Sequence, residues 1–380
     1  MNSAEWRADF EPLGEQIWLN TAHQGVLPLP AAAEAREAIA WKTRPYELTQ
    51  ERFQETPTRL RSALAHLIGA NPDEIVLANS ASYGLHLIAH GYPWRRGDEV
   101  LVTEGDFPSD ILPWLVAERR YGIKVVRIRP RQYVVQPDEL TAAITAKTRM
   151  FCSTWVHSFS GFVADAAALG SVCHDQGVTF VLNASQAIGA RSLRVSAINV
   201  DAVVCAGFKW LCGPYGTGFC WLSPALTGQL RVVQSYWLAS QTAESLELEV
   251  PEVGLREDLG AKGLDVFGTA NFFNFKPFAA AVELIDRYGV DRIAAHDQNL
   301  VEHFVSSLDK REYRLISPRE QSPSRSTLVL FSCHERARNQ SILQRLNAAG
   351  IHVAYRAGSI RLSPHCYNTV QDIDRTLESL

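Results

Sequence analysis

Hydrophobic and polar positions alternate in a regular pattern from about residue 74 onward. Seven short apolar runs, rich in β-branched residues, have the length of buried strands: EIVLAN, DEVLVTE, KVVRIRP, RMFCSTWV, VTFVLNA, DAVVCA and GFCWLS. Helical stretches separate most of these runs, over Leu85–His90, Asp110–Tyr121, Pro137–Ala146 and Asp165–Gln176. The alternation predicts an α/β protein with a mainly parallel seven-stranded sheet covered by helices on both faces. The carboxyl ends of such strands are where active sites gather.

The pattern changes after Leu222. The segment Glu244–Asp265 is polar and irregular, which predicts a loop or a partner-facing excursion. The chain then continues as a small α+β unit, for which we expect helices over Phe272–Tyr288, Asp291–Leu308, Asn339–Ala349 and from Val370, with strands in EYRLIS, TLVLFS, IHVAYR and SIRLSP. The segment REQSPSRS (319–326) reads as an exposed loop. We therefore expect a large domain over 16–270 and a small domain formed by 1–15 and 271–380.

Composition narrows the class of protein. The 380 residues carry a formal net charge of −4, so no basic excess favours nucleic acid or anionic membrane. No apolar run approaches the roughly 20 residues of a membrane span, and the amino terminus has no signal-peptide core. The seven cysteines are scattered, and their spacing suits neither zinc nor a redox pair. We expect reduced thiols in a cytoplasmic protein.

Lys209 is the first candidate for chemistry. It lies in VVCAGFKWLCGPYGTGF, between a predicted buried strand and a glycine-rich loop. A desolvated lysine has a lowered pKa and can attack a carbonyl group to form a Schiff base. The alternative is a lysine at a strand end whose amine simply reaches solvent.

Three other segments place polar or aromatic groups at strand ends. In LANSASYGLHLIA, backbone N–H groups and the hydroxyls of Ser80 and Ser82 would form an anion site at a helix start, or an ordinary cap. In VTEGDFPSDILPW, Phe107 would stack on a planar ring or pack in the core. In RLSPHCYNT, Arg361 would grip a carboxylate or pair internally with Asp372 or Asp374, and Arg356 is a second candidate.

Together these segments resemble the class V aminotransferase family of pyridoxal-phosphate enzymes. The likeness extends from WLNTAHQGVLP to SPHCYNTVQDID, and its densest parts are FKWLCGPYGTGF and NASQAIGA. It implies the aspartate-aminotransferase fold (fold type I), the cofactor pyridoxal 5′-phosphate and a homodimer with shared active sites. The family includes cysteine desulfurases, C–S lyases and isopenicillin N epimerase-like proteins.

The resemblance also implies residue roles. Lys209 would be the Schiff-base lysine and Arg361 would bind the substrate carboxylate, with Arg356 nearby. The residues implied to contact the cofactor are Ala81, Ser82, Phe107, Ser158, Asn183 and Gln186, with Gly268 and Thr269 of FGTAN reaching a partner's site. The amino-terminal segment that closes over the substrate would supply Asn20, Ala22 and His23.

Two departures from the family pattern bear on the reaction. Asn183 stands where the family has an aspartate that keeps the pyridine nitrogen protonated, and an amide cannot do so through charge. An unprotonated nitrogen would weaken transamination most and elimination less, unless another acid reaches the ring. In addition, AYRAGSIRLS lacks the cysteine that desulfurases carry before the arginine strand, and Cys366 reads as packing.

We therefore expect a C–S lyase that carries out β-elimination on a cysteine-derived substrate, such as an S-conjugate in natural-product biosynthesis. Decarboxylating or oxidative deamination of such a conjugate is an alternative. So is amino-acid epimerisation, with His23, His157 or Tyr83 as the second acid/base. A true aminotransferase, a desulfurase and a cofactor-binding protein without turnover remain as further possibilities.

Overall fold

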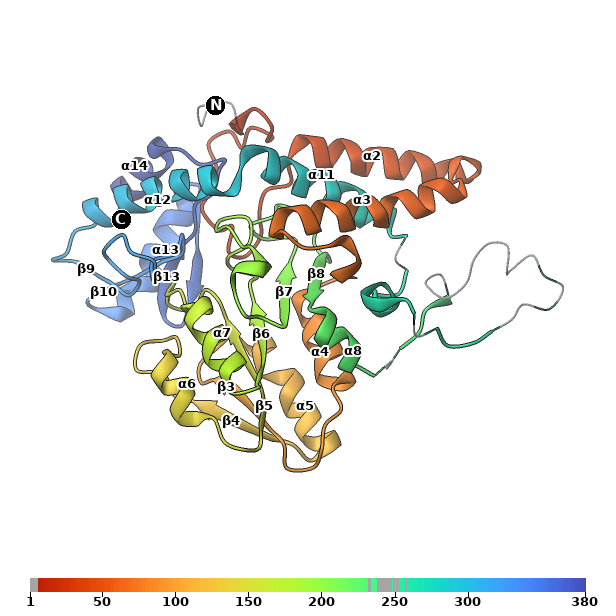
Figure 1. Ribbon diagram of the computed structural model, residues 1–380. Helices are drawn as coiled ribbons and strands as arrows, with labels where there is room; N and C mark the ends of the chain where they lie inside the picture. The colour runs from red at the N-terminus through yellow and green to blue at the C-terminus, as the bar shows by residue number, and fades with distance from the viewer. Residues whose placement is uncertain are drawn as a thin grey trace.

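A seven-stranded sheet forms the centre of the structure (Figure 1). The computed structural model describes residues 6–231, 234–237, 248, 250, 253–256, 258–268 and 270–380. All seven runs expected to be strands belong to this sheet, in the order β2-β8-β7-β6-β5-β3-β4. They are β2 (Ile75–Ala78), β3 (Glu99–Thr103), β4 (Lys124–Ile128), β5 (Thr148–Thr154), β6 (Thr179–Asn183), β7 (Ala202–Ala206) and β8 (Gly218–Leu222).

The sheet is parallel except at one strand. β8 runs antiparallel to both of its neighbours, β7 and β2, because it returns directly from the loop that follows β7. The other neighbouring pairs are parallel. The carboxyl ends of β2, β3, β5, β6 and β7 therefore meet at one edge of the sheet, where α/β proteins build their sites.

Helices cover both faces of the sheet, and alternate strand residues point to different layers. Val100 and Val102 pack with Leu85 and Ile88 of α4, whereas Leu101 joins the opposite core. The covering helices are α4 (Ala81–Gly91), α5 (Leu112–Tyr121), α6 (Pro137–Ala143), α7 (Ala166–Asp175) and α8 (Pro224–Gln229). Of the expected helices, α5 starts two residues late because Pro108–Asp110 form a separate short 3₁₀ helix, η3.

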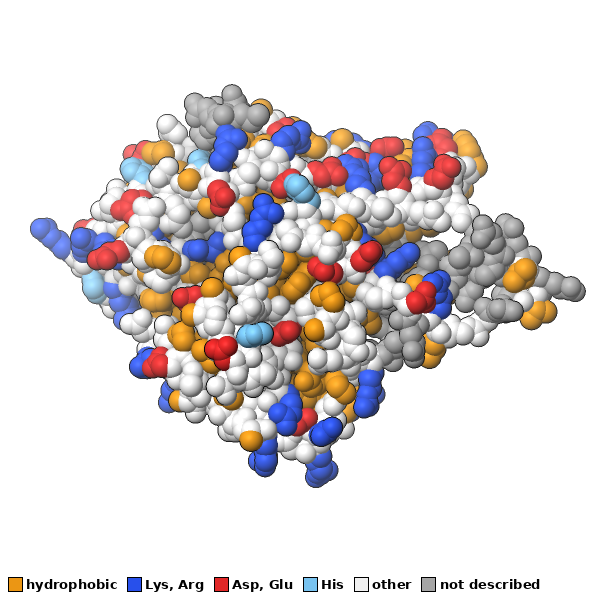
Figure 2. Space-filling view, viewed as in Figure 1, with side chains coloured by type: hydrophobic (Ala, Val, Ile, Leu, Met, Phe, Trp, Pro, Cys, Tyr) orange, Lys and Arg blue, Asp and Glu red, His pale blue; other side chains and the backbone are white. Residues whose placement is uncertain are grey.

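Two long helices precede the sheet and were not expected from the sequence. α2 (Leu29–Thr43) and α3 (Gln50–Ile68) pack on α11 (Phe272–Tyr288), and the three lie together along the top of Figure 1. The side chain of Thr49 caps α3, and Pro57 lies inside it. Figure 2 shows acidic and basic side chains interspersed over this region, where Arg59 pairs with Glu34 and Glu283.

The carboxyl-terminal region forms a second, four-stranded sheet on the left of Figure 1, in the order β12-β13-β10-β9. Its elements are α12 (Val290–Ser307), β9 (Tyr313–Leu315), β10 (Val329–Cys333), α13 (Asn339–Ala348), β11 (Ile351–His352), β12 (Ala354–Arg356), β13 (Ser359–Leu362) and α14 (Val370–Glu378). The run IHVAYR is divided, since β11 pairs with β1 (Ile17–Trp18) and β12 with β13. The loop 319–326 is exposed only in part, because Arg325 and Ser326 are buried.

A buried histidine–aspartate pair joins this region to the loop after β7. His365 and Asp297, the latter on α12, are both fully enclosed, and Nδ1 of His365 lies 2.8 Å from Oδ2 of Asp297. Nε2 of His365 donates to the carbonyl of Trp210 at 3.0 Å, next to Lys209. Burial opposes charge on the ring, yet Cys366 and Asp297 raise the pKa of His365 well above its usual value.

Much of the segment Glu244–Asp265, which was expected to be a loop or a partner-facing excursion, lies outside the described residues. Its end forms the 3₁₀ helix η5 (Gly260–Leu264). In the part of the chain that is described, no helix has the length and apolar character to cross a membrane.

The close approach of α4 to the sheet leads to a first prediction. A Cβ on Gly84 would lie 2.7 Å from Cγ1 of Val204, too near for either side to accommodate without a shift. Gly84→Ala should lower the free energy of unfolding by about 1–3 kcal/mol, measured from urea denaturation. Gly228→Ala in α8 is the control, since nothing lies within 4 Å of that Cβ. Equal stability of the two variants would contradict this packing.

The His365–Asp297 pair leads to a second prediction. Asp297→Asn should cost about 3–5 kcal/mol, because it leaves half of a buried pair without its partner. Asp374→Asn is the control: it breaks the solvent-exposed pair with His303, which should contribute no more than about 1 kcal/mol. A histidine whose pKa is raised in the folded state contributes stability that is fully present below the unfolded pKa of 6.5. This contribution is lost as pH rises through the folded pKa. The gap between wild type and Asp297→Asn should therefore shrink above that pH, and a gap that widens would contradict the pair's charge.

Candidate active site

The residues expected to be functional gather at the carboxyl edge of the large sheet. Phe107 follows β3, Ser158 follows β5, Asn183 ends β6 and Lys209 follows β7. Arg361 comes from β13 of the second sheet and reaches the same place, where its Nη1 donates to the carbonyl of Ser158 at 3.3 Å. The site therefore lies between the two sheets.

The loop that carries Lys209 is held through its main chain. Gly25 N–H donates to the carbonyl of Phe208 at 2.9 Å, and His365 holds the carbonyl of Trp210. Within the loop, Cys212 N–H donates to the carbonyl of Lys209 at 3.0 Å. Because the main chain is held on both sides of Lys209, its side chain leaves from a fixed point.

The Lys209 amine lies in a cationic, partly desolvated place. Its Nζ is 5.7 Å from the centroid of the Phe107 ring. Burial, with the charge of Arg361 next in importance, lowers the pKa of Lys209 to about 8. A lysine with a pKa near 8 keeps a substantial neutral fraction under physiological conditions, and a nucleophilic amine must be neutral. This environment favours a Schiff-base lysine over a lysine whose amine extends into solvent.

Arg361 is a buried cation without a carboxylate partner in the described structure. Only 3% of the residue is exposed, and its Nε has no hydrogen-bond partner. Asp372 caps α14 and Asp374 contacts His303, so neither of the two internal partners considered from the sequence meets it. Burial, and then the charge of Arg356, lowers the pKa of Arg361 to about 10. Such a group fits an anionic ligand.

The amino-terminal segment lies against the same place. Ala22 N–H donates to Oγ of Ser363 at 3.0 Å, two residues beyond Arg361, and Oδ1 of Asn20 is buried without a partner. His23 is solvent-exposed. Partial burial and the charges of Arg356, Arg361 and Lys209 lower its pKa, so the imidazole is neutral near pH 7.

Gln186 links this segment to the lysine loop. The indole N–H of Trp210 donates to its Oε1, and its Nε2 donates to the carbonyl of Ala22, both at 3.0 Å. Because an indole only donates and a carbonyl only accepts, these two contacts fix the amide orientation. One N–H of Gln186 is left for a ligand, which suits the predicted contact with a phenolic oxygen.

The start of α4 was expected to be an anion site or an ordinary helix cap. Oγ of Ser80 accepts from Tyr83 N–H at 3.2 Å, so Ser80 is the capping residue and Ser82 is not. The first N–H groups of a helix have no partner within the helix, which leaves those of Ala81 and Ser82 for a ligand.

Asp106 and Asp110 were not recognised as functional from the sequence. They flank Phe107 and are buried, with 5% and 1% of each residue exposed. Oδ1 of Asp110 accepts from Nδ2 of Asn183 at 2.7 Å. A carboxyl group therefore contacts the amide that replaces the expected acid. The available signal was the pair of aspartates in GDFPSD directly after a predicted strand.

The remaining predicted residues have mixed surroundings. Gly268 is exposed with a φ of 75°, and Thr269 lies outside the described residues. Arg356 ends β12 and donates to the carbonyl of Tyr355. His157 contacts Ser160 and the carbonyl of Gly105, and Tyr83 donates to the carbonyl of Leu264, so both rings have structural partners.

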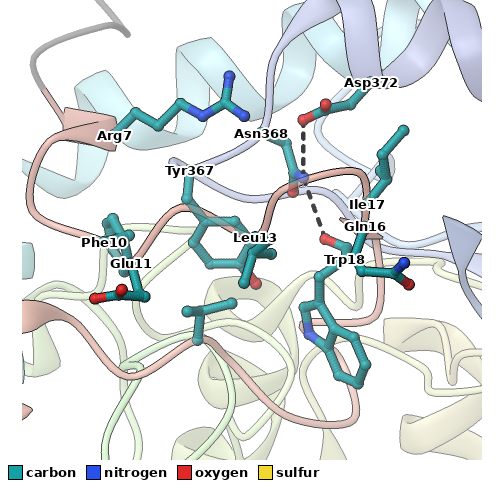
Figure 3. A pocket seen from close by; sticks show the side chains of 11 residues that line it. Arg7, Phe10, Glu11, Leu13, Gln16, Ile17, Trp18, Tyr367, Asn368 and Asp372 are labelled. Atoms are coloured by element: carbon teal, nitrogen blue, oxygen red, sulfur yellow. Dashed lines mark hydrogen bonds between the residues drawn. The ribbon is translucent and has the colours of Figure 1, made fainter. Parts of the chain in front are cut away.

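One pocket lies beside the amino-terminal segment rather than at Lys209 (Figure 3). Its lining includes Trp18 and Val26, which flank the segment, but none of the predicted site residues. Nδ2 of Asn368 donates to the carbonyl of Trp18 at 3.1 Å and to Asp372 at 3.3 Å. The pocket therefore marks where the segment is anchored to the start of α14.

The polar atoms without partners test whether a pyridine cofactor and an amino acid fit here. Asn20 Oδ1, Asp110 Oδ2 and Arg361 Nε are buried without hydrogen bonds. Three cations, Lys209, Arg356 and Arg361, influence the site, and the half-exposed Phe107 ring presents an aromatic face. An anionic ligand with a planar ring would supply what these groups lack.

Comparison with known proteins agrees with this chemistry. The model of the class V aminotransferase family matches residues 38–376. A probable cysteine desulfurase of Methanothermobacter thermautotrophicus is 28% identical over 100% of this chain and 98% of its own. Isopenicillin N epimerase of Streptomyces clavuligerus is 26% identical over 95% of this chain and 93% of its own.

Solved structures show the same fold. The cystine C–S lyase C-DES, in complex with its product cysteine persulfide, superposes with a TM-score of 0.87 at 22% identity, covering 96% of this chain and 97% of that chain. A C-DES mutant with glycine linked to its pyridoxal-phosphate cofactor gives a TM-score of 0.88 at 21% identity, over 98% of both chains. The expected fold type I architecture is confirmed.

The match to the family model spans most of the chain, and the residues at the sheet edge fit the cofactor. The expectation of pyridoxal 5′-phosphate is confirmed with the family. The chain belongs to the class V aminotransferase family of pyridoxal-phosphate enzymes.

Proposed function

We propose that the protein is a C–S lyase that cleaves the Cβ–S bond of a cysteine-derived amino acid. The proposal rests on two groups that occur together in this site. Arg361 is buried and its Nε has no hydrogen-bond partner, and the pKa of Lys209 is lowered to about 8. The first group suits a substrate carboxylate and the second suits a proton acceptor at Cα. The names of the relatives, which include a cystine C–S lyase, support this class of substrate.

The chain's own residues would divide the work as follows. Arg361 holds the α-carboxylate, while Asn20, Ala22 and His23 close over the amino acid from the other side. Ala81 and Ser82 N–H groups hold the cofactor phosphate, Phe107 and Gln186 hold its ring, and Ser158 lies beside it. When bound, pyridoxal 5′-phosphate withdraws electrons from Cα and makes its proton acidic.

Lys209 would receive the Cα proton on Nζ. The C–H electron pair then forms the Cα–Cβ double bond, and the Cβ–S pair leaves with sulfur. With one water the net products are a thiol, pyruvate and ammonia, so no oxidant is needed. Fixing the carboxylate on Arg361 and the amine on a rigid loop sets which Cα bond faces the acceptor.

Two features favour elimination over desulfuration. The chain between β12 and β13 is a two-residue hairpin, Ala357–Gly358, in which both φ angles are positive at 48° and 74°. This is the tight turn that joins neighbouring strands, and it leaves no room for a longer loop carrying a thiol. All seven cysteines, including Cys366, are buried. A persulfide carrier needs an accessible thiolate.

Asn183 favours elimination over transamination. Its amide carries no charge to stabilise a protonated pyridine, so the cofactor is a weaker electron sink. In elimination the departing sulfur takes the electrons, so a weaker sink suffices. Decarboxylating or oxidative deamination of the same conjugates is the nearest alternative.

Amino-acid epimerisation is the second candidate, and His23 is the observation that favours it. Of the three groups considered as a second acid/base, His23 is exposed at the site, whereas His157 and Tyr83 hold structural contacts. The likeness to isopenicillin N epimerase adds weight. Release of pyruvate distinguishes elimination from inversion at Cα, which releases none.

Assembly belongs to the same proposal. We infer a cytoplasmic homodimer in which the exposed Gly268, with Thr269, contacts the partner's cofactor phosphate. The large domain would span 16–270, and 1–15 with 271–380 would form the small domain that carries Arg361. A role in natural-product biosynthesis fits a bulky S-conjugate as substrate.

Replacing Lys209 tests the proposal directly. Borohydride reduction of the holoenzyme should fix the cofactor to the peptide containing Lys209, as seen by mass spectrometry. Lys209→Ala should lose this adduct and at least about 10²–10⁴-fold of pyruvate release, the range for a lost general base. Lys124→Ala, an exposed lysine on β4, is the control and should keep both. Full activity in Lys209→Ala would refute the assignment.

Arg361 is tested through substrate affinity. Arg361→Met should raise KM for a cysteine S-conjugate by about 10–100-fold, since a charge-assisted hydrogen bond contributes about 1.5–3 kcal/mol. The effect on cofactor absorbance should be small. Arg127→Met, on the exposed side of β4, should leave KM unchanged. An unchanged KM in Arg361→Met would place the carboxylate elsewhere.

A further inference from the structure

The carboxyl group of Asp110 contacts the Asn183 amide. Asp110 is on η3, with only 1% of the residue exposed, and its Oδ1 accepts from Nδ2 of Asn183 at 2.7 Å. Its Oδ2 is buried without a partner. A buried carboxyl is rare unless its oxygens are satisfied, so this unused oxygen calls for an explanation.

The Asn183 amide has one orientation. Ser185 N–H donates to its Oδ1 at 3.0 Å, and a backbone N–H can only donate. The amide nitrogen must therefore face Asp110, whether or not that carboxyl is ionised. Asp110 and Ser185 together determine which atoms of Asn183 remain for a ligand.

Asp106 has more hydrogen bonds from the main chain than its neighbour Asp110. Its oxygens accept from Phe107 N–H at 2.7 Å and from Thr154 N–H at 3.1 Å. Burial raises the pKa of Asp106 to about 6. Burial, and then the charge of Asp106, raises the pKa of Asp110 well above its usual value. Burial and the neighbouring charge of Asp106 therefore favour the neutral form of Asp110.

Three other groups face Asp110. Lys209 is near enough to favour its ionised form, as is the Asn183 amide. The thiol of Cys152 is buried and neutral, because burial and then the charge of Asp110 raise its pKa. Asp110 is thus a carboxyl that a change of charge in the site can ionise, one hydrogen bond away from position 183.

We propose that Asp110 is the acid of this site, a positioning residue that acts on the cofactor ring through the Asn183 amide rather than by direct contact. The inference rests on the proposed function, in that it takes position 183 to face the ring nitrogen. The carboxyl group that position 183 lacks is supplied by Asp110, which is hydrogen-bonded to the Asn183 amide. The ring then meets an oriented, polarised amide, which suits elimination better than transamination.

A cycle of four proteins tests this: wild type, Asp110→Asn, Asn183→Asp and the double variant that exchanges the two residues. Asp110→Asn keeps a hydrogen-bond acceptor and removes the ionisable group. Its affinity for pyridoxal 5′-phosphate should fall about tenfold, the equivalent of one pKa unit, and the pH dependence of the bound absorbance should shift. The exchanged variant should bind at least as tightly as wild type. Asp201→Asn, a carboxyl outside the site, should change neither measurement.

Unfolding of the cofactor-free protein by urea gives a readout independent of the loaded enzyme. A carboxyl group whose pKa is raised in the folded state contributes stability that is fully present below the unfolded pKa of 3.8. This contribution is lost as pH rises through the folded pKa, which is about 6 for Asp106. Wild type should therefore lose stability as pH rises from about 4 through about 6. Asp110→Asn should lose less and Asn183→Asp more, because the latter adds a third carboxyl. The exchanged variant should return to the wild-type slope.

The outcomes separate the two proposals. An exchanged variant no better than Asn183→Asp in slope and affinity would overturn the role of Asp110, as would wild-type affinity and absorbance in Asp110→Asn. Absence of any borohydride adduct at Lys209 in wild type would instead overturn the proposed function. In that case the urea slopes still show whether Asp110 and Asn183 are coupled.

Discussion

The placement of one amine in a desolvated, positively charged site is the constraint on which the rest of the structure depends. Lys209 leaves a loop whose carbonyls are held by the amino-terminal segment on one side and by His365 on the other. His365 is in turn paired with Asp297 on α12. Residues separated by more than 300 positions therefore converge on one main-chain segment. A lysine is held in such a place at a cost in stability.

The electrostatics of the site follow from this placement. Burial and then the charge of Arg361 lower the pKa of the Lys209 amine, and burial and then the charge of Arg356 lower the pKa of Arg361. Burial also raises the pKa of Asp106, and burial with the charge of Asp106 raises the pKa of Asp110. A ligand with an anionic group and a basic nitrogen would interact favourably with both the three cations and the two acids.

Much of the sheet was predictable, and the reasons are local. Each strand is a short apolar run bounded by turn residues, so β2 to β8 could be recognised one by one. The helices α2 and α3 were missed because α2 is rich in alanine without a clear apolar stripe, and α3 contains Pro57. Lys209 and Arg361 stood out because a charge in an apolar run is unusual. Asp110 did not, since an aspartate after proline and serine is typical of a turn.

The sequence by itself determined the alternation of strands and helices, the lysine motif and the neutral residue at position 183, because each depends on residue type within a short window. Only the tertiary structure decided what surrounds them. It placed Arg361 of one sheet against Ser158 of the other, removed Asp372 and Asp374 as its partners, and brought Asp110 into hydrogen-bond contact with Asn183 across 73 positions. Contacts of this kind depend on how two buried surfaces meet, and the pattern of a single segment carries no information about its distant neighbour.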